Sequence, residues 1–338
     1  MPAHLSPLHK FYDQRISTCG FLSLTTFILL ILPMTTSASH IQPNLVDLKA
    51  ELEKRLVKKN DQVLGLIFDL PVSYNWRVTK WIRYFQEGSG QKWFATWLEK
   101  STQYMPYLQH QLKKSGLPGD LAYMVMIESG FNPYAISKAK AVGPWQFIEP
   151  TARRYGLQIN GWLDERRDFE KSTLAAIRYL KDLYQEFGSW YLVAASYNMG
   201  ENGLRKQITK LKTKDFWTLA QSGALPQETT DYVPKILAAM LIAKAPSLYG
   251  FTEVPILPPY SFQKIKVKGG IHLSHIADQL NITHQALYEL NPELKNKSIP
   301  SHIGTYYIKV PYGSARLWKE PSLQVAKNNS PSQPPTSP

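Results

Sequence analysis

The sequence predicts a mainly α-helical protein that ends in a small βααβ module. Apolar residues recur at spacings of three and four along most of the chain, and no strand pattern occurs between about residues 76 and 249. The proline-rich stretch 255–259 marks a change in composition. Alternating apolar residues then indicate two strands, near Ile265 and near Ile308, with two short helical stripes between them. A chain of 338 residues has room for one large domain and a small one.

The first 39 residues have the layout of a secretory signal peptide. Basic residues precede an apolar stretch at 21–32, which is too short to span a bilayer comfortably, and small residues follow it. We expect cleavage after Ala38 and no integral membrane span once the signal is removed. Cys19 is the only cysteine and precedes the apolar core, so we expect no lipid anchor through a cysteine. The mature chain would then contain no disulfide and no thiolate metal site.

The net charge of +13 favours a polyanionic partner, which nucleic acid, an anionic membrane or an acidic cell-wall polymer would provide. Export argues against nucleic acid, so we expect no nucleic-acid partner. The eight histidines are scattered and no His-Glu-x-x-His sequence occurs. No phosphate-cradling loop or serine-hydrolase elbow is present either. We therefore expect no cofactor and no metal.

The helical pattern divides into segments. A charged amphipathic helix at 44–60 forms most of an N-terminal helical segment, 40–74. In the main domain, 75–250, glycines at 88 and 90 close one helix and Gly188 ends another, which Ser172 caps. Pro234 suits the first turn of the last helix. The helices expected in this domain are 76–85, 91–114, 121–129, 150–155, 172–187, 190–197 and 232–244.

The residues that carry the functional prediction lie at 121–130, an apolar run that ends in Glu128 and then Gly130. In a helix, Leu121, Met124 and Val125 share a face with Glu128. Burial and the negative end of the helix dipole both disfavour the ionised carboxylate there, so its pKa should be raised. A carboxylic acid that stays protonated near neutral pH suits a general acid. The alternative is a glutamate at a helix end that faces water.

The C-terminal part begins with a stiff linker, 251–262, rich in proline. The βααβ module follows at 263–312, with Gly269 and Gly270 turning the chain after the first strand. Residues 313–338 are rich in Ser, Pro and Asn, and we expect this tail to be disordered.

Four separated blocks resemble the soluble-lytic-transglycosylase-like domains, within which the chain is similar to the membrane-bound lytic murein transglycosylase D subgroup. The blocks are Ile127–Ser137, Ala141–Phe147, Ala195–Gly200 and Glu228–Lys235, and the resemblance covers roughly residues 75–250. It implies a lysozyme-like helical catalytic domain that cleaves the MurNAc–GlcNAc β-1,4 bond of peptidoglycan glycan strands without water. Glu128 would act as general acid and then as base, leaving a 1,6-anhydro end. It also implies a location in the periplasm or cell envelope.

The motif match and the residue types together indicate the substrate contacts. Small hydroxyls beside Glu128 can orient it, contact sugar or cap a loop, and an amide offers both a donor and an acceptor to an acetamido group. Tyrosines can bond the carboxylate or stack on a ring. The candidate substrate-binding residues are Ser129, Ser137, Gln146, Tyr197, Asn198 and Tyr232.

Other carboxylates are given different roles. Glu149 is expected at a solvated surface, whereas Asp164, Glu165 and Asp168 alternate with arginines as in structural ion pairs. Glu201 borders a glycine-bracketed loop and is within possible reach of substrate.

The C-terminal module resembles a LysM domain, which binds glycans that contain N-acetylglucosamine. Where that family has a Gly-Asp-Ser/Thr turn, this sequence reads Gly270-Ile271-His272, so two hydrogen-bonding groups of the sugar-binding turn are missing. The resemblance implies a LysM-like fold and leaves its glycan affinity open. Two alternatives to the transglycosylase remain: a goose-type lysozyme-like hydrolase that uses water, and a non-catalytic peptidoglycan-binding protein.

Overall fold

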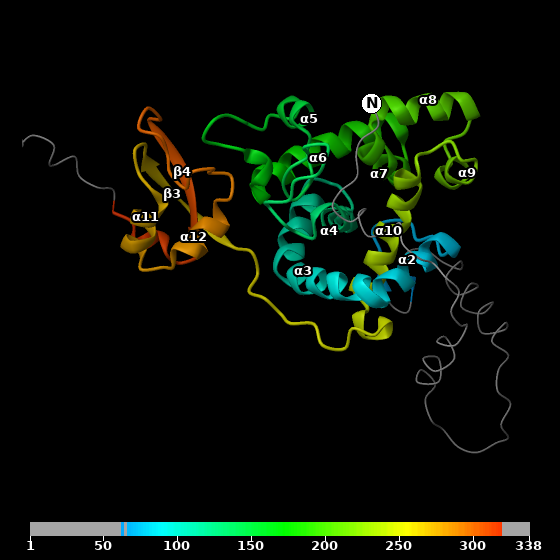
Figure 1. Ribbon diagram of the computed structural model, residues 1–338, viewed down its shortest axis with the longest axis horizontal. Helices are drawn as coiled ribbons and strands as arrows, with labels where there is room; N and C mark the ends of the chain where they lie inside the picture. Colours follow the sequence, from blue (N-terminus) through cyan, green and yellow to red (C-terminus); the bar gives the residue numbers. More distant parts are fainter. Residues whose placement is uncertain (1–61, 64–65, 320–338) are drawn as a thin grey trace, which may run out of the picture. The chain divides into compact units, whose positions relative to one another are not determined.

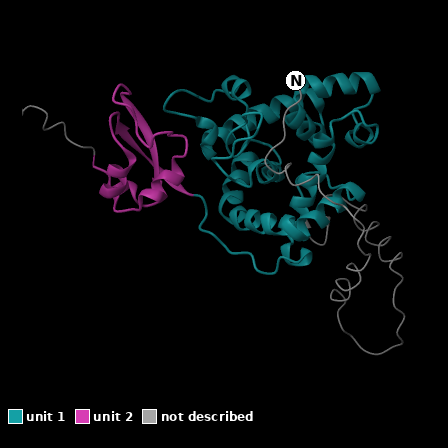
Figure 2. Ribbon diagram, viewed as in Figure 1, with its two compact units in different colours: residues 1–260 teal, residues 261–338 magenta. Residues whose placement is uncertain are grey.

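The computed structural model describes residues 62–63 and 66–319, which form a helical unit and a smaller mixed unit (Figures 1 and 2). The chain divides into two compact units at residue 260, with unit 1 spanning 1–260 and unit 2 spanning 261–338. The predicted signal peptide 1–39, the predicted helix 44–60 and the tail beyond residue 319 lie outside the described residues.

Unit 1 is helical, as predicted. A short antiparallel pair, β1 (Gln62–Val63) with β2 (Leu66–Ile67), precedes the helices. The helices that follow are α2 (Trp76–Gln86), α3 (Gly88–Lys114), the 3₁₀ segment η3 (Gly119–Ala122), α4 (Tyr123–Ser129), α5 (Glu149–Arg154), η4 (Glu165–Arg167), α6 (Phe169–Phe187), α7 (Trp190–Met199), α8 (Glu201–Leu211), α9 (Phe216–Gln221), α10 (Gln227–Lys244) and η5 (Pro246–Tyr249).

Helix α10 is the centre of this unit. Its residues from Thr229 to Ile242 are buried almost without interruption, and it packs against α2, α4 and α7. A helix that is apolar on nearly all sides must be covered all round. The consequence for function is that α10 brings its own side chains beside the end of α4, which carries Glu128.

Several helix boundaries differ from those expected, three of them by three residues or more, and α8 and α9 were not expected. Helix α6 begins at Phe169 because Asp168 caps it, accepting hydrogen bonds from Glu170 N and Lys171 N, and Ser172 lies in its first turn. Helix α10 begins five residues earlier than expected and continues through Pro234. Helix α3 begins at Gly88, because the backbone there turns through positive φ.

Residues 251–260, which we call the strap, run along α3. The Phe251 ring lies 5.5 Å from the Phe94 ring, and the Tyr260 ring lies 5.5 Å from the Tyr104 ring. Two backbone donors fix the segment: Leu257 N bonds Thr102 Oγ1 at 2.9 Å, and Tyr260 N bonds the Gln103 carbonyl at 2.8 Å. The segment that composition marks as a linker thus adds buried aromatic side chains to unit 1 through residue 260.

Unit 2 is the expected βααβ module: β3 (Phe262–Lys268), α11 (Leu273–Leu280), α12 (His284–Leu290) and β4 (Thr305–Pro311), followed by the 3₁₀ segment η6 (Ala315–Leu317). The strands pair antiparallel, with Ile265 opposite Ile308. His272, which stands where the LysM pattern has a hydroxyl, caps α11 by accepting a hydrogen bond from Ser274 N. Within the described ranges, no helix is long and apolar enough to cross a membrane.

Candidate active site

Glu128 lies in the last turn of α4, where the sequence placed it. The residues that lead to Glu128 do not form one continuous α-helix, because the 3₁₀ segment η3 forms the first turn and α4 itself has seven residues. Gly130 ends the helix in the left-handed conformation, with φ +57°. A side chain there would meet Trp97, whose Nε1 would lie 2.2 Å from an added Cβ. The end of α4 is therefore held tightly under α3.

The Glu128 carboxyl is partly buried and bonded to α10. Tyr232 Oη donates a hydrogen bond to Glu128 Oε1 at 2.5 Å. Burial raises the pKa of Glu128 from 4.5 to about 7, and the hydrogen bond from Tyr232 opposes part of that rise. The prediction of a raised pKa at this carboxyl is thus supported by its surroundings, with burial as the leading cause. A group with a pKa near 7 can both give and take a proton at neutral pH.

Tyr197 and Asn198 lie at the end of α7, and Tyr197 is close enough to Glu128 to interact with it electrostatically. Tyr197 Oη donates to the Trp145 carbonyl at 2.6 Å rather than to Glu128. Burial, followed by the negative charge of Glu128, raises the pKa of the Tyr197 hydroxyl well above its usual value. Asn198 Oδ1 accepts a hydrogen bond from Thr229 Oγ1 at 2.7 Å. The first contact joins α7 to the loop after α4, and the second joins α7 to α10.

Two charged residues near Glu128 were absent from the sequence-based list of site residues. Glu228 raises the pKa of Glu128 and Lys235 lowers it. They precede and follow Tyr232 by four and three residues on α10, so all three share one helix face. The sequence signal that could have identified them is this spacing around Tyr232, within the block Glu228–Lys235 that carries part of the family resemblance.

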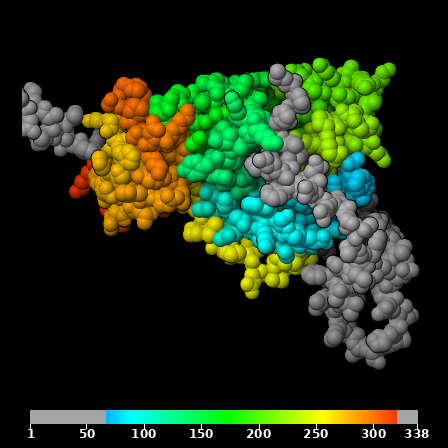
Figure 3. Space-filling view, in the orientation of Figure 1, coloured from blue at the N-terminus to red at the C-terminus, as the bar shows by residue number. Residues whose placement is uncertain are grey.

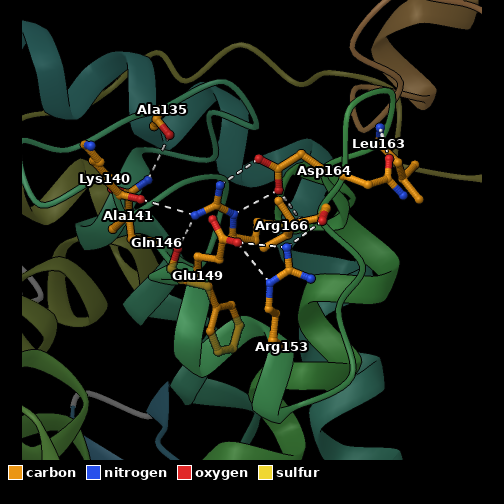
Figure 4. Close-up of polar contacts among 12 residues, drawn as sticks. Ala135, Lys140, Ala141, Gln146, Glu149, Arg153, Leu163, Asp164 and Arg166 are labelled. Atoms are coloured by element: carbon orange, nitrogen blue, oxygen red, sulfur yellow. Dashed lines mark hydrogen bonds and ion pairs between the residues drawn. The ribbon is translucent and has the colours of Figure 1, made fainter.

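The three remaining candidates have their side chains bonded to the loop after α4. Ser129 Oγ donates to the Pro144 carbonyl at 2.9 Å, and Ser137 Oγ accepts from Ala141 N at 3.1 Å. Gln146 Nε2 donates to the Ala135 carbonyl at 3.1 Å and to the Gly143 carbonyl at 2.9 Å (Figure 4). All three remain partly exposed. Loop capping, which the sequence left open for Ser129 and Ser137, is therefore a role that both perform, and Gln146 bonds the loop as well.

A buried ion pair holds this loop through hydrogen bonds to its carbonyl groups (Figure 4). The Arg166 guanidinium bonds both carboxylate oxygens of Asp164, at 2.9 and 2.8 Å. It also donates to the carbonyls of Lys140 and Phe147, at 3.2 and 3.3 Å. Gly143 packs on the same segment, where an added Cβ would lie 1.9 Å from the Arg166 carbonyl oxygen. The sequence-based interpretation of Asp164 as half of a structural ion pair is confirmed.

The other acidic residues also have structural partners. Glu149 forms an exposed pair with Arg153 at 2.8 Å (Figure 4), and Glu165 pairs with Lys171 at 2.6 Å. Glu201 accepts hydrogen bonds from Arg154 at 2.9 Å and from Tyr179 at 3.1 Å. In the part of the chain that the structure describes, no group of three or more His, Cys, Asp or Glu side chains is placed to hold a metal ion.

Comparison with known proteins identifies the two units. Residues 106–220 match the family model described as the transglycosylase SLT domain. Residues 261–326 match the model described as the LysM-like domain of lytic transglycosylase MltD. Unit 1 therefore carries a transglycosylase SLT domain, whose matched stretch includes Glu128 and Asn198 and ends before α10.

The chain is also similar to individual proteins, one of which carries a transglycosylase name. The chain is 34% identical over 222 residues to membrane-bound lytic murein transglycosylase D of Escherichia coli (strain K12), across 64% of this chain and 48% of that protein. It is 36% identical over 122 residues to a putative tributyltin chloride resistance protein of Alteromonas sp. (strain M-1), across 35% of this chain and 59% of that protein. The chain is thus similar to membrane-bound lytic murein transglycosylase D, and it contains a transglycosylase SLT domain and a C-terminal LysM-like domain of the MltD type.

The extent of these matches is partial. The chain spans about half the length of the first of these relatives. The crystal structure of the 70 kDa soluble lytic transglycosylase from Escherichia coli aligns with a TM-score of 0.35 and 24% identity, across 45% of this chain and 25% of that one. The assignment of the fold depends on the helices described above and not on this alignment.

Proposed function

We propose that the protein is a peptidoglycan lytic transglycosylase that cleaves the MurNAc–GlcNAc β-1,4 bond without water. One observation carries the proposal: the carboxyl of Glu128, in the last turn of α4, is bonded to Tyr232 at 2.5 Å and has a pKa of about 7. The match to a transglycosylase SLT domain and the similarity to a murein transglycosylase support the substrate class, and the site supports the chemistry. A second carboxylate is not required as nucleophile, because the substrate supplies its own.

In the first step, Glu128 protonates the glycosidic oxygen as the bond between that oxygen and C1 of MurNAc breaks. The hydrogen bond from Tyr232 occupies Oε1, so Oε2 is the oxygen that carries the proton to the substrate. The carbonyl of the sugar's own acetamido group stabilises the positive charge that develops at C1, which the family resemblance implies.

In the second step, the C6 hydroxyl of the same MurNAc attacks C1, and the Glu128 carboxylate takes the hydroxyl proton. A C1–O6 bond forms, the 1,6-anhydro end is complete, and Glu128 is again protonated. The same group serves as acid and base with equal ease when its pKa lies near the working pH. The opposing effects of burial and of Tyr232 on this pKa support that double role.

The remaining site residues fit substrate positioning. We assign Tyr197, Asn198 and Tyr232 to the wall of the site, because α7 and α10 bring them beside Glu128. We assign Ser129, Ser137 and Gln146 to the loop after α4. The Gln146 amide nitrogen is used by two loop carbonyls, so its oxygen is the group left to contact an acetamido N–H.

We further propose that the protein works in the periplasm or cell envelope, where its substrate is found. The signal-like pattern of residues 1–39 and the LysM-like unit support this location.

Digestion of purified murein tests the proposal. The wild type should release anhydro products, and a hydrolase would give products heavier by one water, which mass spectrometry resolves. Glu128→Gln should lose activity by at least about 100-fold, since general acid catalysis contributes roughly 10²–10⁴-fold. Glu149→Gln is the matched control, because it removes one carboxylate charge from an exposed ion pair and should digest murein like the wild type. A wild type that binds murein and releases nothing would support the non-catalytic alternative.

A further inference from the structure

The outer face of the β3–β4 hairpin in unit 2 presents a row of lysines. Ile265 and Val267 point inward and are buried, so the alternating residues Lys264, Lys266 and Lys268 point outward, and all three are exposed. At about 3.3 Å per residue, neighbouring lysines in the row are about 7 Å apart. Helices α11 and α12 pack on the inner face (Figure 1), whereas on the outer face the three lysines of β3 and Tyr307 of β4 are exposed and Lys309, opposite Lys264, is buried.

The surroundings of this row carry no opposing charge from the strands. Neither 262–268 nor 305–311 contains Asp or Glu. Over residues 261–319 the sequence has eight Lys and Arg against three Asp and Glu. Of the three acidic side chains, Asp278 and Glu289 lie on the helices, and Glu293 is buried. The outer face of the hairpin is therefore the positive face of the unit.

Aromatic and apolar side chains lie beside the lysines. Tyr307, directly opposite Lys266 on β4, is 59% exposed, and Tyr312, just beyond β4, is 76% exposed. Leu317, in η6, is 45% exposed, and Trp318 holds this segment to β3 by donating from Nε1 to the Lys266 carbonyl at 3.1 Å. Figure 3 shows the β4 region, in orange, at the surface of unit 2.

We propose that this outer face, formed by Lys264, Lys266, Lys268 and Tyr307, docks on a lipid surface that contains anionic phospholipid. A polymer that carries carboxylates would pair with the lysines but would make no use of the exposed aromatic and apolar side chains. The exposed tyrosines and Leu317 add amphipathic rings and apolar area, the combination that suits a membrane interface. The Gly270–His272 turn, where LysM-like sugar recognition would be expected, begins two residues after Lys268 and supplies none of the side chains of this face. The proposal requires nothing of the proposed catalysis.

The test uses the full chain with a reporter on the docking face. In a Cys19→Ser background, Thr305→Cys on β4 is labelled with an environment-sensitive fluorophore. The chain is then mixed with vesicles of phosphatidylcholine containing 30% phosphatidylglycerol, or with pure phosphatidylcholine. We expect a blue shift with the anionic vesicles only. Because the reporter senses the hairpin itself, membrane contact by the N-terminal apolar stretch does not produce the signal.

Three comparisons make the result specific. Replacing Lys264, Lys266 and Lys268 by Gln should weaken the vesicle-dependent shift by about 100-fold in lipid concentration, since each basic side chain near an anionic surface contributes roughly fivefold. A matched triple variant, with exposed lysines 92, 206 and 210 of unit 1 replaced by Gln, loses the same charge and should keep the shift. A label at Gln285→Cys on α12 should report no shift.

Other outcomes overturn the proposal. These are the absence of a shift at residue 305, an equal shift at residue 285, or an undiminished shift in the hairpin triple variant with an unchanged thermal transition. A shift produced by purified murein sacculi and not by vesicles would assign the face to the wall polymer instead.

Discussion

Replacing Tyr232 by Phe is the sharpest test of how the site sets the proton affinity of Glu128. The substitution removes the 2.5 Å hydrogen bond to Oε1 and leaves the ring in its place. That bond stabilises the ionised carboxylate, so its loss raises the Glu128 pKa above its present value of about 7. A hydrogen bond to a charged group contributes about 1.5–3 kcal/mol, which corresponds to a rise of roughly one to two pH units.

The assay is the pH dependence of murein solubilisation. Because Glu128 must be protonated to begin the reaction, kcat/KM of the wild type should fall as pH rises through about 7. In Tyr232→Phe the same fall should occur about one to two pH units higher. The maximal rate should also drop by about tenfold, because the carboxyl loses the group that orients it.

Tyr197→Phe provides the matched control. It also removes one hydroxyl from a tyrosine beside Glu128, but that hydroxyl donates to the Trp145 carbonyl. Its activity can fall, while the pH at which activity declines should stay close to that of the wild type. Equal displacement of the profile in both variants, or none in Tyr232→Phe, would refute our account of the Glu128 pKa.

The remaining predictions concern stability. Because the pKa of Glu128 is raised in the folded protein, folding stability is lost as pH rises from about 4.5 through 7. Glu128→Gln should therefore be more stable than the wild type by about 3 kcal/mol at pH 8 and equally stable at pH 4, as measured by thermal unfolding. Arg166→Met leaves Asp164 buried without its partner and should lower the free energy of unfolding by about 3–5 kcal/mol, as measured by denaturant titration. Adding Asp164→Asn should recover part of that stability, and a loss below about 1 kcal/mol in Arg166→Met would show that the pair does not stabilise the loop. Gly143→Ala should destabilise far more than Gly156→Ala, which shares the positive φ but whose added Cβ would make only an ordinary contact, 3.6 Å from Arg178 Nη2. Similar unfolding midpoints would contradict the close approach to Arg166.

The local features of the site were predictable from the sequence. The apolar run before Glu128 and the glycine after it place a carboxyl on a buried helix end, and the structure has both. The contact between Glu128 and Tyr232 was not predictable from spacing, because 104 residues separate them and only the packing of α10 on α4 brings them together. The family motif indicated that both residues mattered without giving the distance between them.

The errors in helix boundaries have a common origin. Ser172 was read as a helix cap and Pro234 as a first-turn residue, because their types favour those positions. In the structure, Asp168 provides the stronger cap of α6, and the buried surroundings of α10 carry the helix through a proline. Tertiary packing therefore overrides a local preference in both places, and a sequence alone does not contain that competition.

The strap has a consequence for how this protein can be divided. Composition suggests separating the catalytic region at residue 250, yet Phe251 and Tyr260 cover aromatic rings of α3. A fragment cut there would expose the rings of Phe94 and Tyr104, and we expect it to aggregate. Exchange of the LysM-like unit between homologues should therefore join the chains after residue 260, so that each helical portion keeps its own closing segment.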